Sequence, residues 1–577
     1  MALARLWIGA AAALASSAAR ALAAAGLCAA AALAARAVYA GFVTLPLRRL
    51  PGPWYTKITG LERKLYAWRH REHHYFMLMF ERYGPLVRVA PDKVGVGEVG
   101  MFRKMMASHD LTKSKMYSDF ALAGENVFTT RSPDFNKIRR RQMGPAFAAS
   151  HIHRMEPLIM AEGVDRLCQL FDAQIRAASD GSKRARAATN VHRAFTMMTT
   201  DLISSLVFGR PLDGVNALIR AVEAPQAHGG AWAERHGSSG DDSDCDGDGD
   251  GDGDGNDDCG GEKREPIIGA MIGTMLLMGL VAELPFLRWL PARFAPRALA
   301  QLYAMRDRYL GFAYNAVVGY RRRMARAGAK RADGAGRVDI LGMLIAAEDP
   351  ETGARMTDWE IASESTVLLA AGTDTSANVL ANCVRLLLLH PDAMSRARAE
   401  VRDAFPDGAQ TITYAAATER LPFLGAVIWE TLRLRSSSSG AWPRDAPRAG
   451  GITLGGHYIP PGAVLYGSVG GANLNPDTWA APKAFVPERF LGPAGEARRR
   501  DVVSFGSGVR LCPGRRLAMV EITMALSTLL HKYDFGLVAP PAADDDYYSQ
   551  LEEVCHITTG FANSERDFTF YVSARSD

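Results

Sequence analysis

The pattern of apolar positions is mostly helical once the N-terminal segment has ended. The longest apolar stretch covers residues 361–389 and would cover all faces of a helix, so it predicts a helix buried in the core. Thr357 and Glu360 have capping-box spacing before it, and Pro391 follows it. Residues 372–376 read Gly-Thr-Asp-Thr-Ser, a polar interruption inside this apolar stretch.

Two short regions alternate apolar and polar residues instead, which is the pattern of β-strands. Residues 85–99 place valines on both sides of a Pro-Asp turn and predict a hairpin. Residues 450–467 predict a second β region. We therefore expect a mainly α protein with minor β, in which residues 50–577 form one large helical domain with small β-sheets.

The N-terminal segment consists almost entirely of Ala, Leu and Val, and residues 21–45 contain a single charge. A span of about 20 apolar residues crosses a bilayer. Arg48 and Arg49 follow, as the positive-inside rule expects on the cytoplasmic side, and a proline-rich stretch ends the helix. Residues 1–49 are thus expected to be a single transmembrane helix that anchors the protein, with a cleaved signal peptide or a transit peptide as alternatives.

A second segment departs from globular composition. Residues 237–262 are almost pure Gly and Asp, cannot bury apolar area and are expected to be disordered. Asp246, Asp248 and Asp250 fit the first half of a calcium-binding loop. The glutamate that should end such a loop is missing, and the repeat would match many frames by chance. An insertion without chemistry is the preferred interpretation.

Composition narrows the function classes. The chain has 577 residues and a net charge of +5, too small and too spread out to indicate a nucleic-acid partner. Its seven cysteines contain no Cys-x-x-Cys pair, which argues against a zinc site and a disulfide framework. The cysteines are Cys28, Cys168, Cys245, Cys259, Cys383, Cys512 and Cys555.

Cys512 is unusual among these cysteines because it lies in a glycine-rich loop, FGSGVRLCPG (residues 505–514). The residues after Gly514 have a strongly helical pattern, so the thiol is expected at a helix N-terminus, where backbone N–H groups favour a negatively charged sulfur. The glycines allow close approach of a flat, bulky group. Arg510 offers a guanidinium to a carboxylate on that group.

This loop resembles the haem-binding signature of the cytochrome P450 family, Phe-x-x-Gly-x-Arg-x-Cys-x-Gly. Phe505, Gly508, Arg510, Cys512 and Gly514 fill every fixed position. The resemblance implies haem b as cofactor, with the Cys512 thiolate as the axial ligand of the iron and the other four residues around the haem.

The polar interruption in the long helix resembles the oxygen-activating segment of the same family. The resemblance implies that Ala371 and Gly372 leave room for dioxygen. It assigns Asp374 and Thr375 to an acid–alcohol pair that relays protons. The alternative is a helix kink, or hydroxyls that bond to the preceding turn.

Glu430, Arg433 and Arg489 match the family's buried structural triad, which combines a Glu-x-x-Arg helix with a Pro-Glu-Arg-Phe segment. Arg140 and Arg444 are carried over as contacts of the two haem propionates. The family usually has Trp or His four residues before the first of these arginines, and here Asn136 stands there, which puts that contact in doubt. A solvated surface arginine is the alternative for both.

The resemblance covers the chain from about residue 50 to its end and implies a haem-thiolate monooxygenase. Such an enzyme inserts one oxygen atom from dioxygen into a lipophilic small molecule by hydroxylation, epoxidation or further oxidation. The chain contains no dinucleotide-binding turn and no flavin domain, so electrons are expected from NADPH-cytochrome P450 reductase. The arginines expected to dock this partner are Arg498, Arg499, Arg500, Arg515 and Arg516.

The anchor and the high alanine content resemble fungal microsomal enzymes of secondary metabolism, with the catalytic domain on the cytosolic side of the endoplasmic reticulum. Residues 117–128, the long helix and residues 436–442 are expected to line the substrate pocket. Three other functions remain open. They are a haem-thiolate isomerase or dehydratase, a nitric oxide reductase of the same fold, and a non-catalytic haem-binding sensor or scaffold.

Overall fold

The structure is a computed structural model of the chain. It describes residues 46–121, 124–179, 185–224, 265–327, 339–407, 411–538, 551–555 and 558–575, with a few residues between 25 and 42. The Gly/Asp-rich segment (237–262) and most of the expected anchor (1–49) lie outside the described residues. No helix within the described part of the chain is both long and apolar enough to span a membrane.

Helices make up most of the described chain. The α-helices are α2 (Leu61–Trp68), α3 (Glu72–Tyr83), α4 (Val99–Met106), α5 (Lys115–Asp119), α6 (Pro133–Met143), α7 (Ala149–Leu158), α8 (Asp165–Ala177), α9 (Val191–Phe208), α10 (Gly214–Glu223), α11 (Glu265–Glu283), α12 (Arg297–Ala327), α13 (Ile340–Ala346), α14 (Asp358–Leu389), α15 (Pro391–Ala404), α16 (Tyr414–Arg420), α17 (Pro422–Leu434), α18 (Val469–Asn473), α19 (Gly492–Arg498), α20 (Arg515–Lys532) and α22 (Ser564–Asp567). Shorter helical turns include η7 (Pro285–Trp289), η8 (Ala292–Phe294), η10 (Pro487–Phe490) and η12 (Gly508–Arg510).

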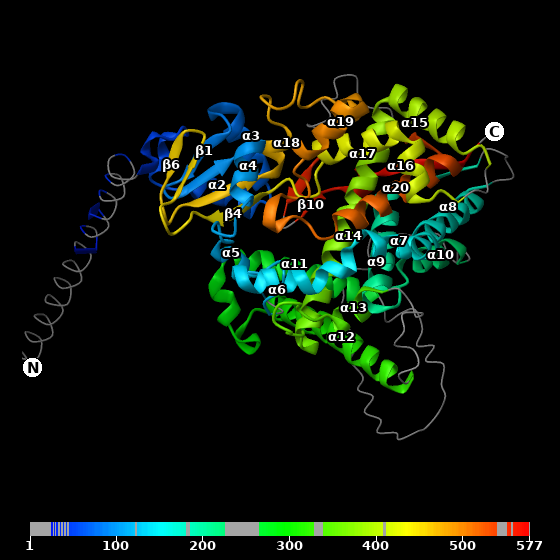
Figure 1. Ribbon diagram of the computed structural model, residues 1–577, viewed down its shortest axis with the longest axis horizontal. Coiled ribbons are helices and arrows are strands. Elements are labelled where there is room, and N and C mark those ends of the chain that lie inside the picture. Colours follow the sequence, from blue (N-terminus) through cyan, green and yellow to red (C-terminus); the bar gives the residue numbers. More distant parts are fainter. Residues whose placement is uncertain are drawn as a thin grey trace, which may run out of the picture.

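The long helix α14 runs through the middle of the molecule (Figure 1). The predicted capping box is present: the Glu360 N–H donates to Thr357 Oγ1, and the Thr357 N–H donates to Glu360 Oε2. The helix ends at Leu389, two residues before Pro391. It packs most extensively against α9 and α12, which explains why apolar residues surround it on all sides.

Four small sheets accompany the helices in the part of the chain that the structure describes. Their strands are β1 (Leu86–Ala90), β2 (Lys93–Val96), β3 (Arg186–Asn190), β4 (Ala441–Asp445), β5 (Ile452–Leu454), β6 (His457–Ile459), β7 (Val464–Ser468), β8 (Tyr533–Leu537), β9 (Glu553–Cys555), β10 (Thr559–Phe561) and β11 (Thr569–Ala574). The largest has the order β1-β2-β7-β4, with β2 and β7 parallel. It lies at one end of the molecule, beside α2, α3 and α4 (Figure 1).

Both predicted β regions are confirmed. The hairpin is β1 and β2, in which Leu86 pairs with Val96, and the second region contains the β5–β6 hairpin and β7. The sheet β3-β11-β8 was not predicted. Strand β11 pairs with β3 and β8, which lie far from it in the sequence, so no short turn between the paired strands indicates the sheet.

Candidate active site

A cavity of about 400 Å³ lies between α14, the start of α20, α11 and the β4 region. Its walls come mainly from apolar side chains. The predicted stretches 117–128 and 436–442 both contribute lining residues, as does α14. The sequence did not indicate the wall formed by α11, where Met271, Met275 and Met278 face the cavity.

The loop before α20 brings Cys512 to this cavity. Its backbone turns sharply at Gly506 (φ +73°) and Gly508 (φ +61°), a conformation that favours glycine. A Cβ atom on Gly508 would also lie 2.0 Å from the carbonyl oxygen of Met106, at the end of α4. The Cys512 N–H then donates to the Phe505 carbonyl over 2.9 Å, which closes the loop.

The side chain of Cys512 is open to the cavity although protein surrounds the site on the other sides. Burial raises the pKa of its thiol. The N–H groups of Gly514 and Arg515 and the charge of Arg140 lower it, but burial outweighs them. The expectation of a lowered pKa is therefore wrong for the protein atoms alone, because desolvation exceeds the helix-terminus effect. A coordinated metal would reverse this balance, since it deprotonates a thiol outright.

Four cationic side chains converge beside the cysteine loop. Arg140 comes from α6, Arg444 from β4, Arg510 from η12 and Lys113 from the segment before α5, and all four line the cavity. Burial, followed by the charges of Arg444 and Arg140, lowers the pKa of Arg510 to about 10. Burial and the three arginines together hold the pKa of Lys113 well below its usual value.

This cluster fits a ligand that carries two carboxylates. Nη1 and Nη2 of Arg510 are buried and have no hydrogen-bond partner among the described residues. A cluster of like charges with orphaned donors is costly unless anions occupy it. The propionates of a haem next to Cys512 would meet this need.

Hydrogen bonds show where the two arginines expected at the haem propionates, Arg140 and Arg444, are held. Arg140 Nη2 donates to the Leu511 carbonyl in the cysteine loop over 2.7 Å. Arg444 Nη1 donates to the Tyr117 hydroxyl over 2.9 Å. Neither is a solvated surface residue. Asn136 is buried, and its amide donates to the Val127 carbonyl, which also accepts from Lys113.

Lys113 is a site residue that the sequence did not indicate. It donates to the carbonyl oxygens of Val127 and Phe128, and its Nζ lies 4.7 Å from the Tyr117 ring centroid. A lysine in a short polar stretch has no distinguishing pattern. Only the tertiary fold places it beside arginines from three other elements.

The polar interruption of α14 reaches the cavity through Thr375. Thr375 Oγ1 donates to the Ala371 carbonyl over 2.8 Å, so its hydroxyl bonds to the preceding turn. Asp374 is not among the residues that line the cavity, and burial raises the pKa of its carboxyl to about 6. The Thr375 hydroxyl therefore lies at the cavity wall, whereas the Asp374 carboxyl lies behind it.

Gly372 has a packing role in addition to lining the cavity. A Cβ atom there would lie 2.6 Å from Cγ1 of Ile203 on α9. The missing side chain thus lets α9 and α14 approach closely. Ala371 and Gly372 both line the cavity, and room for dioxygen beside them stays a prediction.

Glu521 on α20 is a second residue that the sequence missed. It lines the cavity and hydrogen-bonds with Ser376, the residue after Thr375. Burial raises the pKa of its carboxyl to about 8, so it is mainly protonated at neutral pH. A single glutamate in a helical pattern carries no signal that separates a buried acid from a surface one.

The structural triad is confirmed. Arg433 binds Glu430 through two hydrogen bonds of 2.7 Å, and both side chains are fully buried. Arg489 Nε lies 3.3 Å from Glu430 Oε1. Arg433 also donates to the carbonyls of Asn473, Pro482 and Ala484, so one guanidinium joins α17 to the chain that leads to the cysteine loop.

Comparisons with known proteins agree with this site. A family model described as Cytochrome P450 matches residues 259–548. The chain is 27% identical to cytochrome P450 monooxygenase helB1 and 28% identical to cytochrome P450 monooxygenase helB2, both from Aspergillus fumigatus. These alignments cover 92% of this chain, with 83% of helB1 and 94% of helB2.

Two further similarities extend the comparison. Cytochrome P450 monooxygenase AKT7 from Alternaria alternata is 28% identical, over 86% of this chain and 85% of that protein. The crystal structure of a cytochrome P450DA heme domain superposes with a TM-score of 0.61 at 20% identity. That superposition covers 87% of this chain and 92% of the other, and it shows a shared fold.

Proposed function

The chain belongs to the cytochrome P450 family, and from this premise we propose that it is the haem-thiolate monooxygenase of a fungal secondary-metabolite pathway. It is an oxidoreductase whose cofactor is haem b with a cysteine thiolate as axial ligand. The observation that carries the proposal is the convergence of Cys512 with four buried or half-buried cations on one apolar cavity. The relatives named above, all called monooxygenases, support the reaction type.

The haem-binding residues follow from the site. Cys512 would bind the iron, while Phe505, Gly508 and Gly514 shape the loop around it. Haem bound in this way supplies the redox chemistry that activates dioxygen. The cations proposed to bind the propionates are Arg510, Arg140, Arg444 and Lys113.

Proton handling is assigned to α14. We assign the hydroxyl of Thr375 to holding a proton at the cavity wall, and the carboxyl of Asp374 to supplying it from behind the helix turn. The raised pKa of Asp374, about 6, suits a group that gains and loses a proton near neutral pH. The apolar walls exclude bulk water from the reacting centre.

The test uses the purified full-length protein loaded with haem. We expect a carbon monoxide difference spectrum with the red-shifted Soret band in the native protein and in Thr375→Ala, and its loss in Cys512→Ala. Thr375→Ala should consume NADPH while releasing hydrogen peroxide instead of product. A red-shifted band that survives in Cys512→Ala would refute the assignment. Turnover without oxygen or electrons would support an isomerase instead.

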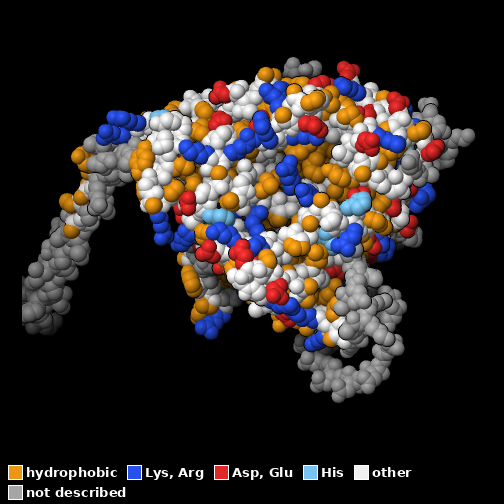
Figure 2. All heavy atoms as spheres, viewed as in Figure 1, with side chains coloured by type: hydrophobic (Ala, Val, Ile, Leu, Met, Phe, Trp, Pro, Cys, Tyr) orange, Lys and Arg blue, Asp and Glu red, His pale blue; other side chains and the backbone are white. Residues whose placement is uncertain are grey.

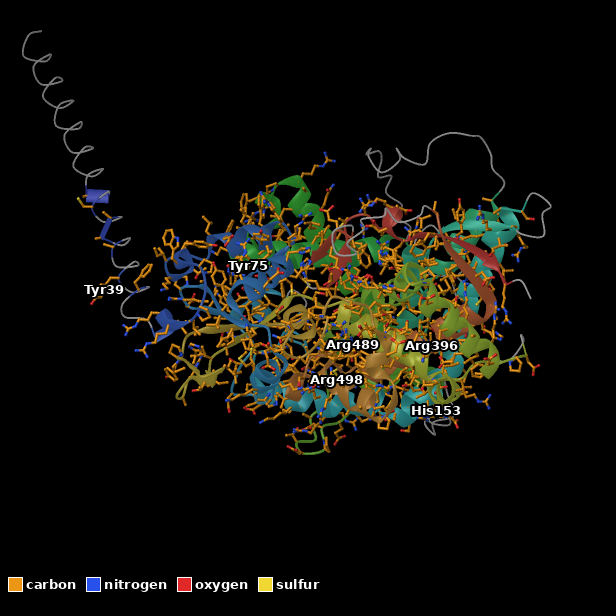
Figure 3. All side chains as sticks on the ribbon, turned by 90° about the horizontal axis from the view of Figure 1, so that it is seen from above. Tyr39, Tyr75, His153, Arg396, Arg489 and Arg498 are labelled. Carbon is orange, nitrogen blue, oxygen red and sulfur yellow. The ribbon has the colours of Figure 1, made fainter. Side chains whose placement is uncertain are left out.

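The electron donor is proposed to be NADPH-cytochrome P450 reductase, which would dock on the face formed by α15, η10 and α19 and the start of α20. Arg396, Arg489 and Arg498 lie on this side in Figure 3. The five arginines expected for docking differ in exposure. Arg498, Arg500 and Arg516 are exposed, whereas Arg499 and Arg515 lie 6.0 and 5.5 Å from the Trp429 ring centroid.

Charge reversal would test this docking face. We expect Arg500→Glu with Arg516→Glu to raise the reductase concentration needed for half-maximal reduction, most strongly at low ionic strength. The carbon monoxide spectrum should stay unchanged. An unchanged dependence on reductase concentration would move the docking site elsewhere.

Membrane association is proposed on two grounds: the apolar N-terminal segment, and exposed apolar side chains on the folded part. The η7–η8 segment projects from the body of the molecule, and hydrophobic side chains cover it (Figures 1 and 2). Phe286 is 63% and Trp289 80% exposed, and Trp54 and Trp68 are similarly open. Such residues favour a membrane interface.

A membrane test separates these two contributions. Residues 1–49 are proposed as the anchor to the endoplasmic reticulum and residues 50–577 as the cytosolic catalytic unit. We expect the full-length protein to float with phosphatidylcholine vesicles in a density gradient. A chain that begins at residue 50 should bind more weakly, and Phe286→Ser with Trp289→Ser should weaken it further. Equal flotation of all three would contradict the proposal.

The substrate is proposed to be a lipophilic small molecule. The cavity walls combine the α11 methionines with aromatic side chains such as Phe120, Phe128 and Trp442. Its charged residues gather at the end that fits the propionates. Comparing the metabolites of a fungus with and without this gene would identify the compound class.

A further inference from the structure

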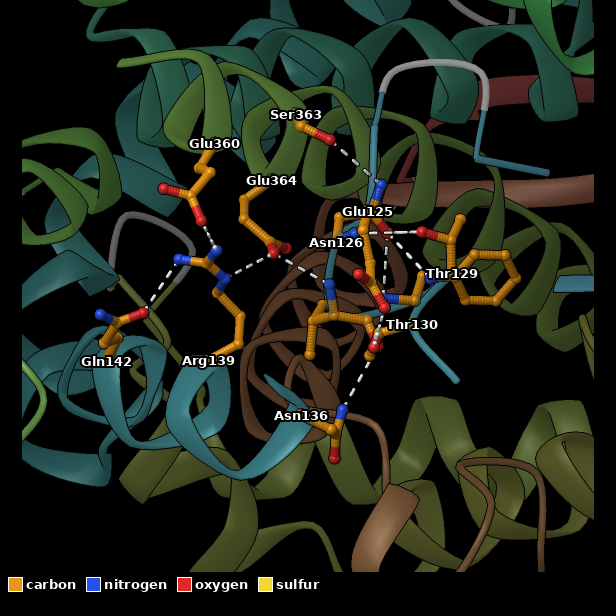
Figure 4. Close-up of polar contacts among 12 residues, drawn as sticks. Glu125, Asn126, Thr129, Thr130, Asn136, Arg139, Gln142, Glu360, Ser363 and Glu364 are labelled. Atoms are coloured by element: carbon orange, nitrogen blue, oxygen red, sulfur yellow. Dashed lines mark hydrogen bonds and ion pairs between the residues drawn. The ribbon is translucent and has the colours of Figure 1, made fainter. Parts of the chain in front are cut away.

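Residues 125–130 form an irregular stretch of backbone over the cavity. Asn126, Val127, Phe128 and Thr129 from this stretch line it. An irregular segment holds one conformation only where other elements fix it. Lys113 and Asn136 donate to its carbonyl groups, and its N–H groups and amide lead to α14, where the buried Glu364 carboxylate lies (Figure 4).

The direct contacts join the segment to α14. The Val127 N–H donates to Glu364 Oε1 over 2.9 Å, and the Asn126 amide lies 3.3 Å from the Ser363 hydroxyl. Asn126 Oδ1 in turn accepts the N–H groups of Phe128 and Thr129, at 3.1 and 2.9 Å. Four consecutive residues are therefore ordered from two neighbouring side chains of α14.

A buried arginine completes the arrangement. Arg139 Nε lies 3.1 Å from Glu364 Oε1, and Arg139 Nη2 donates to Glu360 Oε1 over 2.6 Å. Its Nη1 donates to Gln142 Oε1 over 2.9 Å. Arg139 is the neighbour of Arg140, which contacts the cysteine loop, so α6 connects the segment to the haem-binding side.

The Glu364 carboxylate is only partly satisfied. Its Oε2 is buried without a hydrogen-bond partner among the described residues. Burial, as the largest effect, raises the pKa of Glu364 to about 7. Arg139, the Val127 N–H and Lys113 lower it, and Glu360 raises it. A buried ion pair of this kind contributes little net stability, but it can fix one conformation.

We propose that Glu364, paired with Arg139, is a positioning residue that pre-orders residues 125–130 and thereby sets how tightly a bulky ligand binds next to the haem. The inference rests on the proposed function, because it assumes haem beside Cys512. A segment that is ordered before binding imposes no ordering cost on the ligand. Protonation of Glu364 removes its charge from Arg139, so the hold on the segment weakens as the pH falls below 7.

Two haem-iron ligands of different size test this role on the full-length haem protein. Imidazole is a small ligand of haem iron, whereas miconazole carries bulky aromatic groups on its imidazole, so we expect only miconazole to contact the segment. Spectral titration gives both dissociation constants. Glu364→Ala should weaken miconazole binding about tenfold and leave imidazole binding unchanged, the effect of losing a charge-assisted hydrogen bond. Glu364→Gln keeps an acceptor for Val127 and should have a smaller effect.

Asp201→Asn is the matched control. Asp201 on α9 is an equally buried carboxyl that accepts two N–H groups, from Gly214 and Val215, each at 2.8 Å, and it does not line the cavity. Its replacement should lower thermal stability without changing the ratio of the two dissociation constants. Ser363→Ala, a mild change, should shift that ratio in the same direction as Glu364→Ala.

The pH dependence supplies a second readout. Protonation of the azole itself weakens binding equally in both proteins, so the readout is the ratio of the native protein's miconazole affinity to that of Glu364→Gln. That ratio should decline as the pH falls through 7. An unchanged or increased miconazole-to-imidazole affinity ratio in Glu364→Ala would overturn the proposal, as would an equal shift in Asp201→Asn. If the native protein shows no red-shifted carbon monoxide band, the proposed haem–Cys512 ligation itself is refuted.

Discussion

The hydroxyl of Ser437 donates a hydrogen bond of 2.8 Å to the carbonyl oxygen of Thr375. Ser437 follows α17 and lines the cavity, so a side chain that a substrate can touch is tied to the backbone of the proposed proton-handling residue. On the other side of α14, Thr199 Oγ1 donates to the Thr373 carbonyl over 2.6 Å. This helix segment is thus held from two neighbouring elements.

Removing the first of these bonds should affect oxygen use more than folding. We expect Ser437→Ala to lower stability by about 1 kcal/mol, the usual contribution of one hydrogen bond. Hydrogen peroxide release per NADPH should rise, because Thr375 loses its support. Ser437→Thr retains the hydroxyl and should restore the native ratio. A peroxide yield equal in all three proteins would show that the contact has no role in oxygen use.

The buried triad should be far more sensitive than a surface ion pair of similar geometry. Arg433→Ala leaves the Glu430 carboxylate buried and unpaired, which costs about 3–5 kcal/mol. We expect little haem to be retained. Arg396, which binds Glu488 over 2.8 Å at the surface, is the control, and Arg396→Ala should change stability by no more than about 1 kcal/mol. Chemical unfolding and haem content measure both; equal losses would contradict the assignment.

The cationic cluster predicts opposite effects on the haem-free and haem-bound protein. Arg510→Gln removes a positive charge from the crowded cationic cluster, so the haem-free protein should melt at a higher temperature. The same change removes a propionate partner worth about 2 kcal/mol, or roughly thirtyfold in haem affinity. Calorimetry and haem transfer to apomyoglobin measure the two effects. A lower melting temperature of haem-free Arg510→Gln would show that the clustered charges do not repel one another. The control Arg516→Gln, at an exposed site, should change neither the melting temperature nor the haem affinity.

Glu521 predicts a pH dependence of stability. Its pKa is raised to about 8 in the folded protein, above the ordinary value of 4.5, so the folded state holds a proton that the unfolded state releases. Stability is therefore lost as the pH rises from 4.5 to 8, by up to about 1.4 kcal/mol per pH unit. Glu521→Gln removes this slope, and its advantage over the native protein should grow across that window and then level off. A constant difference from pH 4.5 to 8 in urea unfolding would refute the raised pKa.

Local signals predicted the elements that carry the site. The capping box at Thr357 and Glu360 marked the start of α14, and alternating valines marked the β1–β2 hairpin, because both patterns act between residues close in the chain. The loop around Cys512 was recognisable because the backbone conformation of the loop requires glycine at fixed positions. Gly506 and Gly508 have positive φ angles, which glycine adopts readily.

Contacts between distant segments were not predictable in the same way. Lys113 and Glu521 carry no motif, and their burial arises only when α20 and the segment before α5 pack beside α14. The same holds for Glu364, whose pKa depends on Arg139, 225 positions earlier in the chain. The pKa of Cys512 also went against the local expectation, since burial is a property of the folded whole.

The sequence by itself determined the family, the central helix, the cysteine loop and the triad, because each depends on residue types at fixed short spacings. Only the tertiary structure decided which cations gather beside Cys512, that Asp374 lies off the cavity wall while Thr375 lines it, and that Glu364 holds residues 125–130. These facts depend on desolvation and on charges brought together from distant segments, and both are set by packing.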